Sequence, residues 1–453
     1  MKRTYKFVAV STTGILMFLA GCTPPGAPPS AGQSADVSAA AQGLNWNNID
    51  YAKLKGQTVT ILWTMTGSAA KVRPKIEQAF TKETGIKVRN IGVDYNSVYN
   101  KVMTSEMSNS SDIDLAEMDT IWAGDYDNGN IAVNLSNVIP KNVQAKFTPS
   151  SLRSVEYKGD IMGVPWYSST KHFYWNNKLL HEAGISSPPT TWDQFMTDSK
   201  IIQQKLGSKG TYASAWSWKQ AESLTCDYVG FLGSFGGQFF DANGRPAFNS
   251  GGGLKALQYM TDLMKSGTVD PASLQWTEED VMNAFAAGKI AMMSNWESMY
   301  PALNDPTQSK VVHQTDVGLL PGEGSVRSAA VTGSEGISLL KNSKHKEAAL
   351  AFLKFIASRE YQFDEFNDEG QYPTLRSLYS DPKVESADTT HTLGKIEAEF
   401  QYGVNRPNAP GYVVWGDILS SDIHSALMGT KSPGQALNDA AMSINGAIKS
   451  AED

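Results

Sequence analysis

Apolar residues near the start of the folded region follow two alternating patterns. The run over residues 59–63 has the length of a buried strand, and the segments 86–93 and 113–118 repeat it. Between the first two runs, apolar side chains recur at helical spacing over residues 72–80. Strands and helices that alternate at this distance favour right-handed crossovers, so we expect an α/β fold with a mostly parallel sheet.

A second series of elements begins near Gly163. Thr191 and Gln194 fit a capping box at the start of a helix, and an apolar stripe over residues 254–264 predicts another helix. Residues 290–293 predict a further strand. The body of about 400 residues exceeds the usual size of a single core, so we expect two lobes.

The first 22 residues have the pattern of an export signal. Basic residues precede an apolar stretch that is too short and too interrupted to span a bilayer. Leu19-Ala20-Gly21-Cys22 resembles a bacterial lipobox, which implies cleavage before Cys22 and lipid on its sulfur. Residues 1–21 would then be a lipoprotein signal peptide, and residues 22–56 the lipidated cysteine with a flexible tether rich in Pro, Ala, Gly and Ser. An ordinary secretory signal that happens to contain a cysteine is the alternative.

The lipid would hold the protein at the outer face of the cytoplasmic membrane, on the extracellular or periplasmic side, while the folded part stays in water. The formal net charge of −7 and the lack of a basic run argue against nucleic acid as a partner. Cys226 is then left single, and the six histidines are scattered without ligand-like spacing. Metalloprotease, nucleotide-binding and nucleophile-elbow motifs are absent from the sequence, so we expect no metal, no cofactor and no catalytic residue.

Five segments together resemble the family 1 extracellular solute-binding proteins of ABC importers, the group that contains the maltose-binding proteins. They appear in order behind the lipobox, and the resemblance covers nearly all of the body, from about residue 57 to residue 448. The segments are GVPWYSSTKHFYWNNKLLHEAGISSPPTTWDQF (163–195), FGGQFFDANGRPAFNS (235–250), FAAGKIAMMSNW (285–296), VTGSEGISL (331–339) and RPNAPGYVVWGDILSSDIHSALMG (406–429).

The resemblance implies a type II periplasmic-binding-protein-like fold, in which three hinge crossovers join two lobes. Lobe 1 would comprise residues 57–164 plus 318–358, and lobe 2 residues 165–317 plus 359–452. The crossovers would lie near residues 164–167, near 317–320 and between 359 and 372. Because strain is confined to a few hinge residues, the lobes could move as rigid bodies around a ligand.

A sugar ring has an apolar face of C–H groups and a rim of hydroxyls, so its site needs flat aromatic rings and polar side chains. Buried aromatic area would supply much of the affinity, and hydrogen bonds would select the sugar. The aromatic candidates for the ligand site are Trp63, Trp122, Trp166, Trp218, Trp296, Tyr372 and Trp415. Trp296 and Trp415 are the preferred pair, Trp415 because sugar-binding relatives place a stacking Trp there.

The polar candidates lie at expected strand ends and in loops. Asp119 ends the third strand, where an acidic residue in relatives accepts hydrogen bonds from sugar hydroxyls. Arg406 could contact hydroxyls or merely pair with a carboxylate. The remaining candidates are Thr66 and Gly67 after the first strand, and Gly333 and Ser334, which resemble the family's glycine-rich approach to the ligand.

The resemblance implies a monomer that captures a sugar, expected to be an oligosaccharide, and delivers it to membrane permease subunits driven by a separate ATPase. The loop after the first strand lacks the Asp-Lys pair of maltose-binding proteins, which weakens the case for maltodextrins. Two alternatives stay open: a binding protein of the same fold for a non-sugar solute, and an enzyme that acts on surface polysaccharide.

Overall fold

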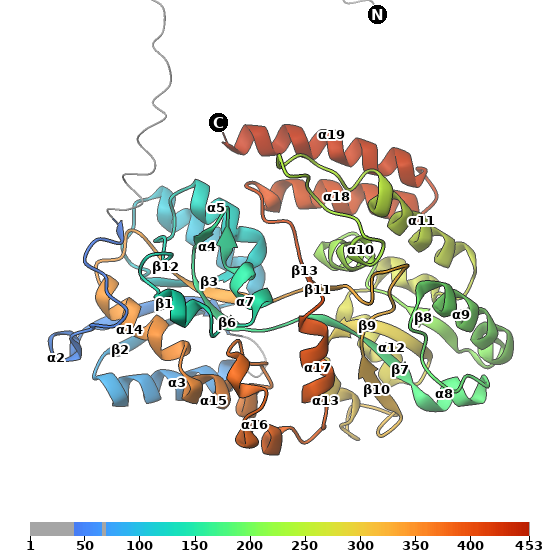
Figure 1. The fold of residues 1–453 in the computed structure, drawn as a ribbon, viewed down its shortest axis with the longest axis horizontal. Coiled ribbons are helices and arrows are strands. Elements are labelled where there is room, and N and C mark those ends of the chain that lie inside the picture. The colour runs from blue at the N-terminus through green and yellow to red at the C-terminus, as the bar shows by residue number, and fades with distance from the viewer. Residues whose placement is uncertain (1–39, 66–68, 453) are drawn as a thin grey trace, which may run out of the picture.

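The computed structural model describes residues 40–65 and 69–452. The expected signal peptide, Cys22, and the candidates Thr66 and Gly67 lie outside these residues. Figure 1 shows two sheets side by side, each covered by helices, with the short strands β11 and β13 between them. The two-lobed α/β arrangement predicted from the sequence is confirmed. Within the described residues, no helix combines the length and apolar character needed to cross a membrane.

The first lobe is built on a five-stranded sheet in the order β2-β1-β3-β12-β6. Strands β1, β2 and β3 run parallel, as their alternation with helices predicts, whereas β12 runs antiparallel to both of its neighbours. The strands are β1 (Thr58–Thr64), β2 (Lys87–Val93), β3 (Leu115–Asp119), β12 (Glu335–Leu339) and β6 (Val164–Tyr167), with helices α3 (Ala69–Thr84), α4 (Tyr95–Met107) and α14 (Lys346–Ile356) packed on them.

The second lobe is built on a four-stranded sheet in the order β10-β7-β9-β8. Its first long helix begins at the expected cap, where the Thr191 hydroxyl accepts a hydrogen bond from the Gln194 amide at 3.2 Å. The strands are β7 (Lys171–Asn176), β8 (Tyr212–Ala215), β9 (Ile290–Trp296) and β10 (Thr315–Gly318). The larger helices are α9 (Trp192–Leu206), α10 (Glu222–Ser234), α11 (Gly251–Lys265), α12 (Glu278–Ala286), α18 (Tyr412–Leu427) and α19 (Pro433–Glu452).

Shorter elements complete both lobes. They are α2 (Tyr51–Leu54), η1 (Thr120–Trp122), α5 (Ala123–Asn128), α6 (Lys141–Gln144), α7 (Pro149–Ser154), β4 (Glu156–Tyr157), β5 (Asp160–Ile161), α8 (Asn177–Glu182), η2 (Gly207–Lys209), η3 (Pro271–Gln275), η4 (Glu297–Met299), α13 (Tyr300–Leu303), α15 (Arg359–Glu369), η5 (Arg376–Leu378), α16 (Pro382–Ala387) and α17 (Leu393–Phe400).

Three linkers carry the chain between the lobes and lie side by side. Residues 168–170 join β6 to β7, and residues 319–334, which include β11 (Ala330–Thr332), join β10 to β12. The third linker contains strand β13 (Gly403–Asn405), which pairs in parallel with β11. The backbone of Thr170 also bridges to Thr332, so the linkers support one another at the centre of the molecule (Figure 1).

Two expected lobe boundaries differ from the structure. β6 extends the first sheet to Tyr167, three residues beyond the expected end of lobe 1 at 164. α15 was expected in lobe 2 but contacts α3 and α14 of the first lobe. The physical reason is side-chain packing: the ring of Tyr361 lies 5.6 Å from that of Phe355, and the Trp166 indole N–H donates to Glu365 at 3.1 Å.

Candidate functional site

A cavity of about 350 Å³ lies between the two lobes beside the linkers, within the size range of small-ligand sites. We call it the linker cavity. Its walls come from both sheets, from α10 and α12, and from all three linkers. The lining residues are Tyr95, Asp119, Tyr167, Ser169, Glu222, Ser223, Cys226, Glu278, Trp296, Glu297, Ser298, Gly333, Glu335, Gln371 and Arg406.

Arg406 connects the two lobes across this cavity. Its guanidinium pairs with Asp119 at the carboxyl end of β3 and with Glu222 at the start of α10, the latter at 3.1 Å. The Tyr95 hydroxyl donates to Asp119 at 2.5 Å, and the Tyr412 hydroxyl donates to Glu222 at 2.8 Å. Burial raises the pKa of Glu222, while the charge of Arg406 opposes that shift. The guanidinium therefore neutralises carboxylates of both lobes at once.

Glu335 lies on the first-lobe wall, where antiparallel pairing of β12 with β3 places it opposite Asp119. Its neighbour Glu117 is held by the Thr64 amide at 2.6 Å and the Thr64 hydroxyl at 2.8 Å. Burial raises the pKa of Glu335 well above its ordinary range, and the nearby charges of Glu117 and Asp119 raise it further. Within the described residues, the buried Oε2 of Glu335 has no hydrogen-bond partner.

Glu297 lies on the opposite wall, directly after β9. Its carboxylate accepts hydrogen bonds from the Thr170 amide at 2.9 Å and the Ser169 hydroxyl at 3.2 Å. Burial outweighs these contacts and raises the pKa of Glu297 to about 7. The carboxyl group is therefore fixed in place by the first linker and stays partly protonated near neutral pH.

Trp296 gives the cavity a half-buried indole. A Cβ atom at Gly333 would lie 2.7 Å from the indole, so only glycine lets the second linker approach the ring this closely. The ammonium of Lys171 lies 5.3 Å from the ring centroid and pairs with Asp227 at 2.8 Å and Glu278 at 3.3 Å. The indole therefore lies close to the linker backbone and to the charged ammonium of Lys171.

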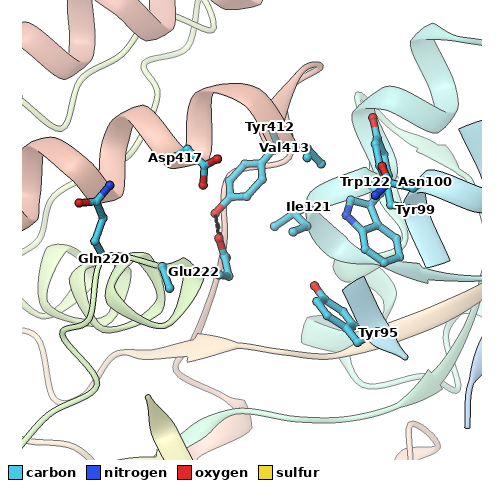
Figure 2. A pocket seen from close by; sticks show the side chains of 12 residues that line it. Tyr95, Tyr99, Asn100, Ile121, Trp122, Gln220, Glu222, Tyr412, Val413 and Asp417 are labelled. Carbon is cyan, nitrogen blue, oxygen red and sulfur yellow. Dashed lines mark hydrogen bonds between the residues drawn. The ribbon is translucent and has the colours of Figure 1, made fainter. Parts of the chain in front are cut away.

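A second cavity of about 350 Å³ shares Tyr95 and Glu222 with the first and lies between helices of the two lobes. We call it the helix cavity. In Figure 2, Trp122 and Tyr95 stand on one side, and Glu222 and Tyr412 on the other. The rings of Tyr95 and Trp122 are stacked at 5.5 Å. The lining residues are Tyr95, Tyr99, Asn100, Ile121, Trp122, Gln220, Ala221, Glu222, Tyr412, Val413, Gly416 and Asp417.

The structure brings five of the sequence candidates to these cavities. Asp119, Trp296, Gly333 and Arg406 line the linker cavity, and Trp122 lines the helix cavity. Whether each contacts a ligand stays a prediction. The alternative foreseen for Arg406, pairing with a carboxylate, is what the described structure contains.

Two further candidates support the linkers instead of lining a cavity. The buried Ser334 hydroxyl accepts a hydrogen bond from the Ser169 amide at 3.0 Å. Tyr372 is buried, its backbone bridges to Ser168, and its ring packs against Phe366 and Phe400. Both residues position the chain where it passes between the lobes.

Four of the predicted stacking tryptophans lie in the hydrophobic core. Trp63, Trp166, Trp218 and Trp415 are at most 1% exposed, so no ring face is available to a ligand. Trp63 and Trp166 pack on each other at 5.7 Å, and Trp218 stacks on Trp216 at 5.6 Å.

The predicted stacking role is wrong for Trp415, which was one of the preferred pair. Its indole N–H donates to the Pro410 carbonyl at 3.0 Å, and its ring lies 4.6 Å from Tyr412 and 5.9 Å from Phe239. These contacts give Trp415 a packing role under the helix cavity. Trp296 lines the linker cavity, whereas Trp415 lines neither the linker cavity nor the helix cavity.

Sequence reasoning missed Tyr95 and did not select Glu222, Glu278 or Glu297 for the site. A signal for Tyr95 existed, because it follows the second parallel strand and the carboxyl ends of such strands meet at one sheet edge, beside Asp119. The glutamates come from the other lobe, and no local pattern shows that this lobe faces Asp119. Among the described residues, no cluster of His, Cys, Asp and Glu is arranged to hold a metal ion.

Comparison with known proteins gives consistent matches. A probable ABC transporter-binding protein of Deinococcus radiodurans is 27% identical over 390 residues, which cover 84% of this chain and 91% of the relative. The mannitol-binding protein of Pseudomonas aeruginosa is 25% identical over 320 residues, covering 67% and 73%. The solved structure of maltose-bound MalE3 from T. maritima has a TM-score of 0.75 at 26% identity, covering 86% of this chain and 100% of that protein.

The family profile described as bacterial extracellular solute-binding protein matches residues 63–363, which is more than half of the chain. This match agrees with the fold, with the two lobes and with a cavity placed between them. The chain belongs to the bacterial extracellular solute-binding protein family.

Proposed function

We propose that this protein binds a carbohydrate in the cleft between its lobes and delivers it to the permease of an ABC importer. The observation that carries the proposal is the linker cavity itself. It combines the half-buried face of Trp296 with carboxylates from both lobes, which are hydrogen-bond acceptors for hydroxyl groups. Aromatic area and acceptors together match the apolar face and the hydroxyl rim of a sugar ring.

The relatives support a polyhydroxylated ligand. One is named for mannitol, and a structural neighbour was solved with maltose. Anionic solutes fit the cavity less well, because Arg406, its one lining cation, is already paired with Asp119 and Glu222. A neutral ligand that donates several hydrogen bonds meets no such obstacle.

The two-lobed architecture supports capture by closure. A ligand that contacts Asp119 in one lobe and Trp296 in the other stabilises the closed form by its differential affinity for that form. Moving a population from 1:99 to 99:1 requires a preference of about 5.5 kcal/mol. One stacked ring and several charge-assisted hydrogen bonds are of this order. The linkers absorb the motion, because they carry the chain from one lobe to the other.

Delivery and anchoring extend the proposal beyond the binding site. The sequence contains no nucleotide-binding motif, so the energy for import comes from partner subunits. A lipid on Cys22 keeps the protein beside its permease at the outer face of the membrane. Replacing Cys22 with Ala should release the protein into the soluble extracytoplasmic fraction. Retention of the variant in the membrane would contradict the lipid anchor.

Calorimetric titration with a panel of mono- and oligosaccharides tests the binding function. We expect an affinity in the micromolar range for at least one sugar, about −8 kcal/mol, with a change in Trp fluorescence. Chromatography of the released ligand should return it unaltered, which distinguishes a binding protein from an enzyme acting on polysaccharide. Absence of heat for every sugar would contradict the proposal.

A further inference from the structure

The linker cavity carries far more negative than positive groups. Five carboxyl side chains line it, and the one lining cation is the guanidinium of Arg406. Carboxylates that are removed from water need a partner of opposite charge or several hydrogen bonds, since otherwise they retain a proton. The charge of each of the five groups therefore depends on whether it has a cationic partner. The five are Asp119, Glu222, Glu278, Glu297 and Glu335.

Three of these carboxylates are neutralised within the protein. Arg406 pairs with Asp119 and Glu222, as described above. The ammonium of Lys171 lies 3.3 Å from Glu278, although it must also serve the buried Asp227. Arg406 and Lys171 are thus shared among four carboxylates and leave no positive charge for others. The four are Asp119, Glu222, Asp227 and Glu278.

The remaining two carboxyl groups have no cation of their own. Among the side chains that the structure describes, neither Glu297 nor Glu335 takes part in an ion pair. Glu297 accepts only neutral hydrogen bonds, from Ser169 and Thr170, and the buried Oε2 of Glu335 has no partner. Glu297 is 1% exposed and Glu335 is 7% exposed, and both line the same cavity.

The two groups lie on either side of the first linker. Glu335 pairs in register with Tyr167 at the end of β6, and Glu297 holds the next residues, Ser169 and Thr170. The indole of Trp296, adjacent to Glu297 in the chain, lines the same cavity. Two uncompensated acids and an aromatic ring thus border the space beside the linker, an environment that favours a cation.

We propose that the ligand is an amine-bearing saccharide, whose ammonium group pairs with Glu297 and Glu335 in the linker cavity. The proposal rests on the function proposed above and specifies its substrate class. An ammonium supplies three donors, and its hydrogen bonds to carboxylates are about twice as strong as neutral ones. Glu297 and Glu335, whose buried Oε2 has no hydrogen-bond partner among the described residues, both line the cavity that would receive the ammonium. A uronate or a sugar phosphate would instead bring a negative charge and supply no countercharge to either acid.

The raised pKa values of both acids agree with this assignment, because burial without a countercharge is what raises them. Hydroxyl groups of a neutral sugar would also form hydrogen bonds with these two groups, but an ammonium in addition supplies the countercharge that favours their ionised form. The two ligand classes therefore differ in affinity and in their response to salt.

The test compares sugars that differ only in one substituent. The pairs are glucose with glucosamine, galactose with galactosamine, and cellobiose with fully deacetylated chitobiose, with glucuronate as the anionic probe. We expect the amine-bearing member of the pair that binds to have an affinity about tenfold or more above its hydroxyl counterpart, measured by calorimetry near neutral pH. Raising the salt from about 20 to 200 mM should reduce the preference.

Variants of the full chain assign the preference to residues. Glu335→Gln and Glu297→Gln should each reduce the ratio of the two affinities to about threefold or less. Glu279→Gln is the matched control, because Glu279 is exposed on α12 beside Glu278 and lines neither cavity. Circular dichroism and thermal unfolding establish that each variant is folded, and two independent positions keep the test decisive if one variant fails to fold.

The outcomes separate this inference from the function on which it rests. Equal or tighter binding of the hydroxyl member, or binding of glucuronate, would overturn the amine preference and leave carbohydrate binding intact. Failure of every sugar in the panel to bind would contradict the proposed function and the inference with it. An unchanged preference in both Gln variants would overturn the assignment to Glu297 and Glu335.

Discussion

The linker cavity and the helix cavity share Tyr95 and Glu222, but the chemical character of their walls differs. The linker cavity is lined mainly by carboxyl groups and small residues, with Trp296 as its indole. The helix cavity is lined by aromatic and aliphatic side chains, and its acids are Glu222 and Asp417. The charged groups of the linker cavity can select a ligand by its substituents. The aromatic rings of the helix cavity can contact the apolar face of a sugar with little dependence on its substituents.

Arg406 is the residue on which the charge of the linker cavity depends most. We expect Arg406→Met to lower the free energy of unfolding by about 3 kcal/mol, because it leaves the buried Asp119 and the half-buried Glu222 without their countercharge. Urea-induced unfolding monitored by Trp fluorescence measures the loss. The matched control is Arg245→Met at an exposed position. A loss below about 1 kcal/mol would show that the ion pairs of Arg406 are dispensable.

Glu297 should make the stability of the protein depend on pH. Its pKa is about 7 in the folded protein and near its ordinary value of 4.5 when unfolded, so between these values the folded state binds more protons. Its contribution is therefore lost as the pH rises through this window, by roughly 3 kcal/mol in total. Chemical unfolding of the wild type and of Glu297→Gln at several pH values isolates this part from other groups.

The same comparison includes its own check against other titrating residues. Buried His172, whose pKa is lowered to about 4, and Glu399, whose pKa is raised to about 7, titrate in both proteins and cancel in the difference. A wild-type minus variant difference that stays constant from about pH 4.5 to 7 would contradict the assignment of the shift to Glu297.

Trp296 should matter for binding more than for folding. We expect Trp296→Ala to weaken sugar binding about 30-fold, or about 2 kcal/mol, because it removes the indole surface of the linker cavity. Calorimetry with the best sugar of the panel measures the change. Trp175→Ala is the control, since Trp175 is a half-buried indole on the neighbouring strand β7 and lines neither cavity. Equal losses in both variants would indicate a general effect on folding.

The helix cavity should give the smallest effect and one that depends on ligand length. We expect Trp122→Ala to weaken binding of a tetrasaccharide about fivefold, near 1 kcal/mol, and to leave a monosaccharide unchanged. The reason is that the two cavities adjoin at Tyr95 and Glu222, so a longer ligand extends from the first into the second. Calorimetric titration with sugars of increasing length tests this. An equal loss for the monosaccharide would show that Trp122 acts through the fold.

The sequence predicted the features that local patterns encode. Alternating strands and helices gave the parallel strands β1, β2 and β3, and a parallel strand exposes its final residue at the ligand edge, which located Asp119. Trp296 and Gly333 were candidates because each lies in one of the segments that resemble the family. These residues line the linker cavity because the strand and linker that carry them end there.

The sequence could not separate a core tryptophan from one at a cavity. Trp415 and Trp296 both follow plausible ligand-site patterns, but Trp415 is covered by Phe239 and Tyr412, which are distant from each other in the chain. Burial of that kind depends on tertiary contacts between α10, α11 and α18. The same limit applies to Glu222, which meets Asp119 only through Arg406.

A crystal structure of the protein with the tightest-binding sugar of the panel tests the central claim most directly. We predict that the sugar lies between the lobes in the linker cavity, with one ring face against Trp296 and hydrogen bonds to Asp119 or Glu335 on the opposite wall. A sugar bound on the outer surface of one lobe, with the linker cavity unchanged, would contradict this account.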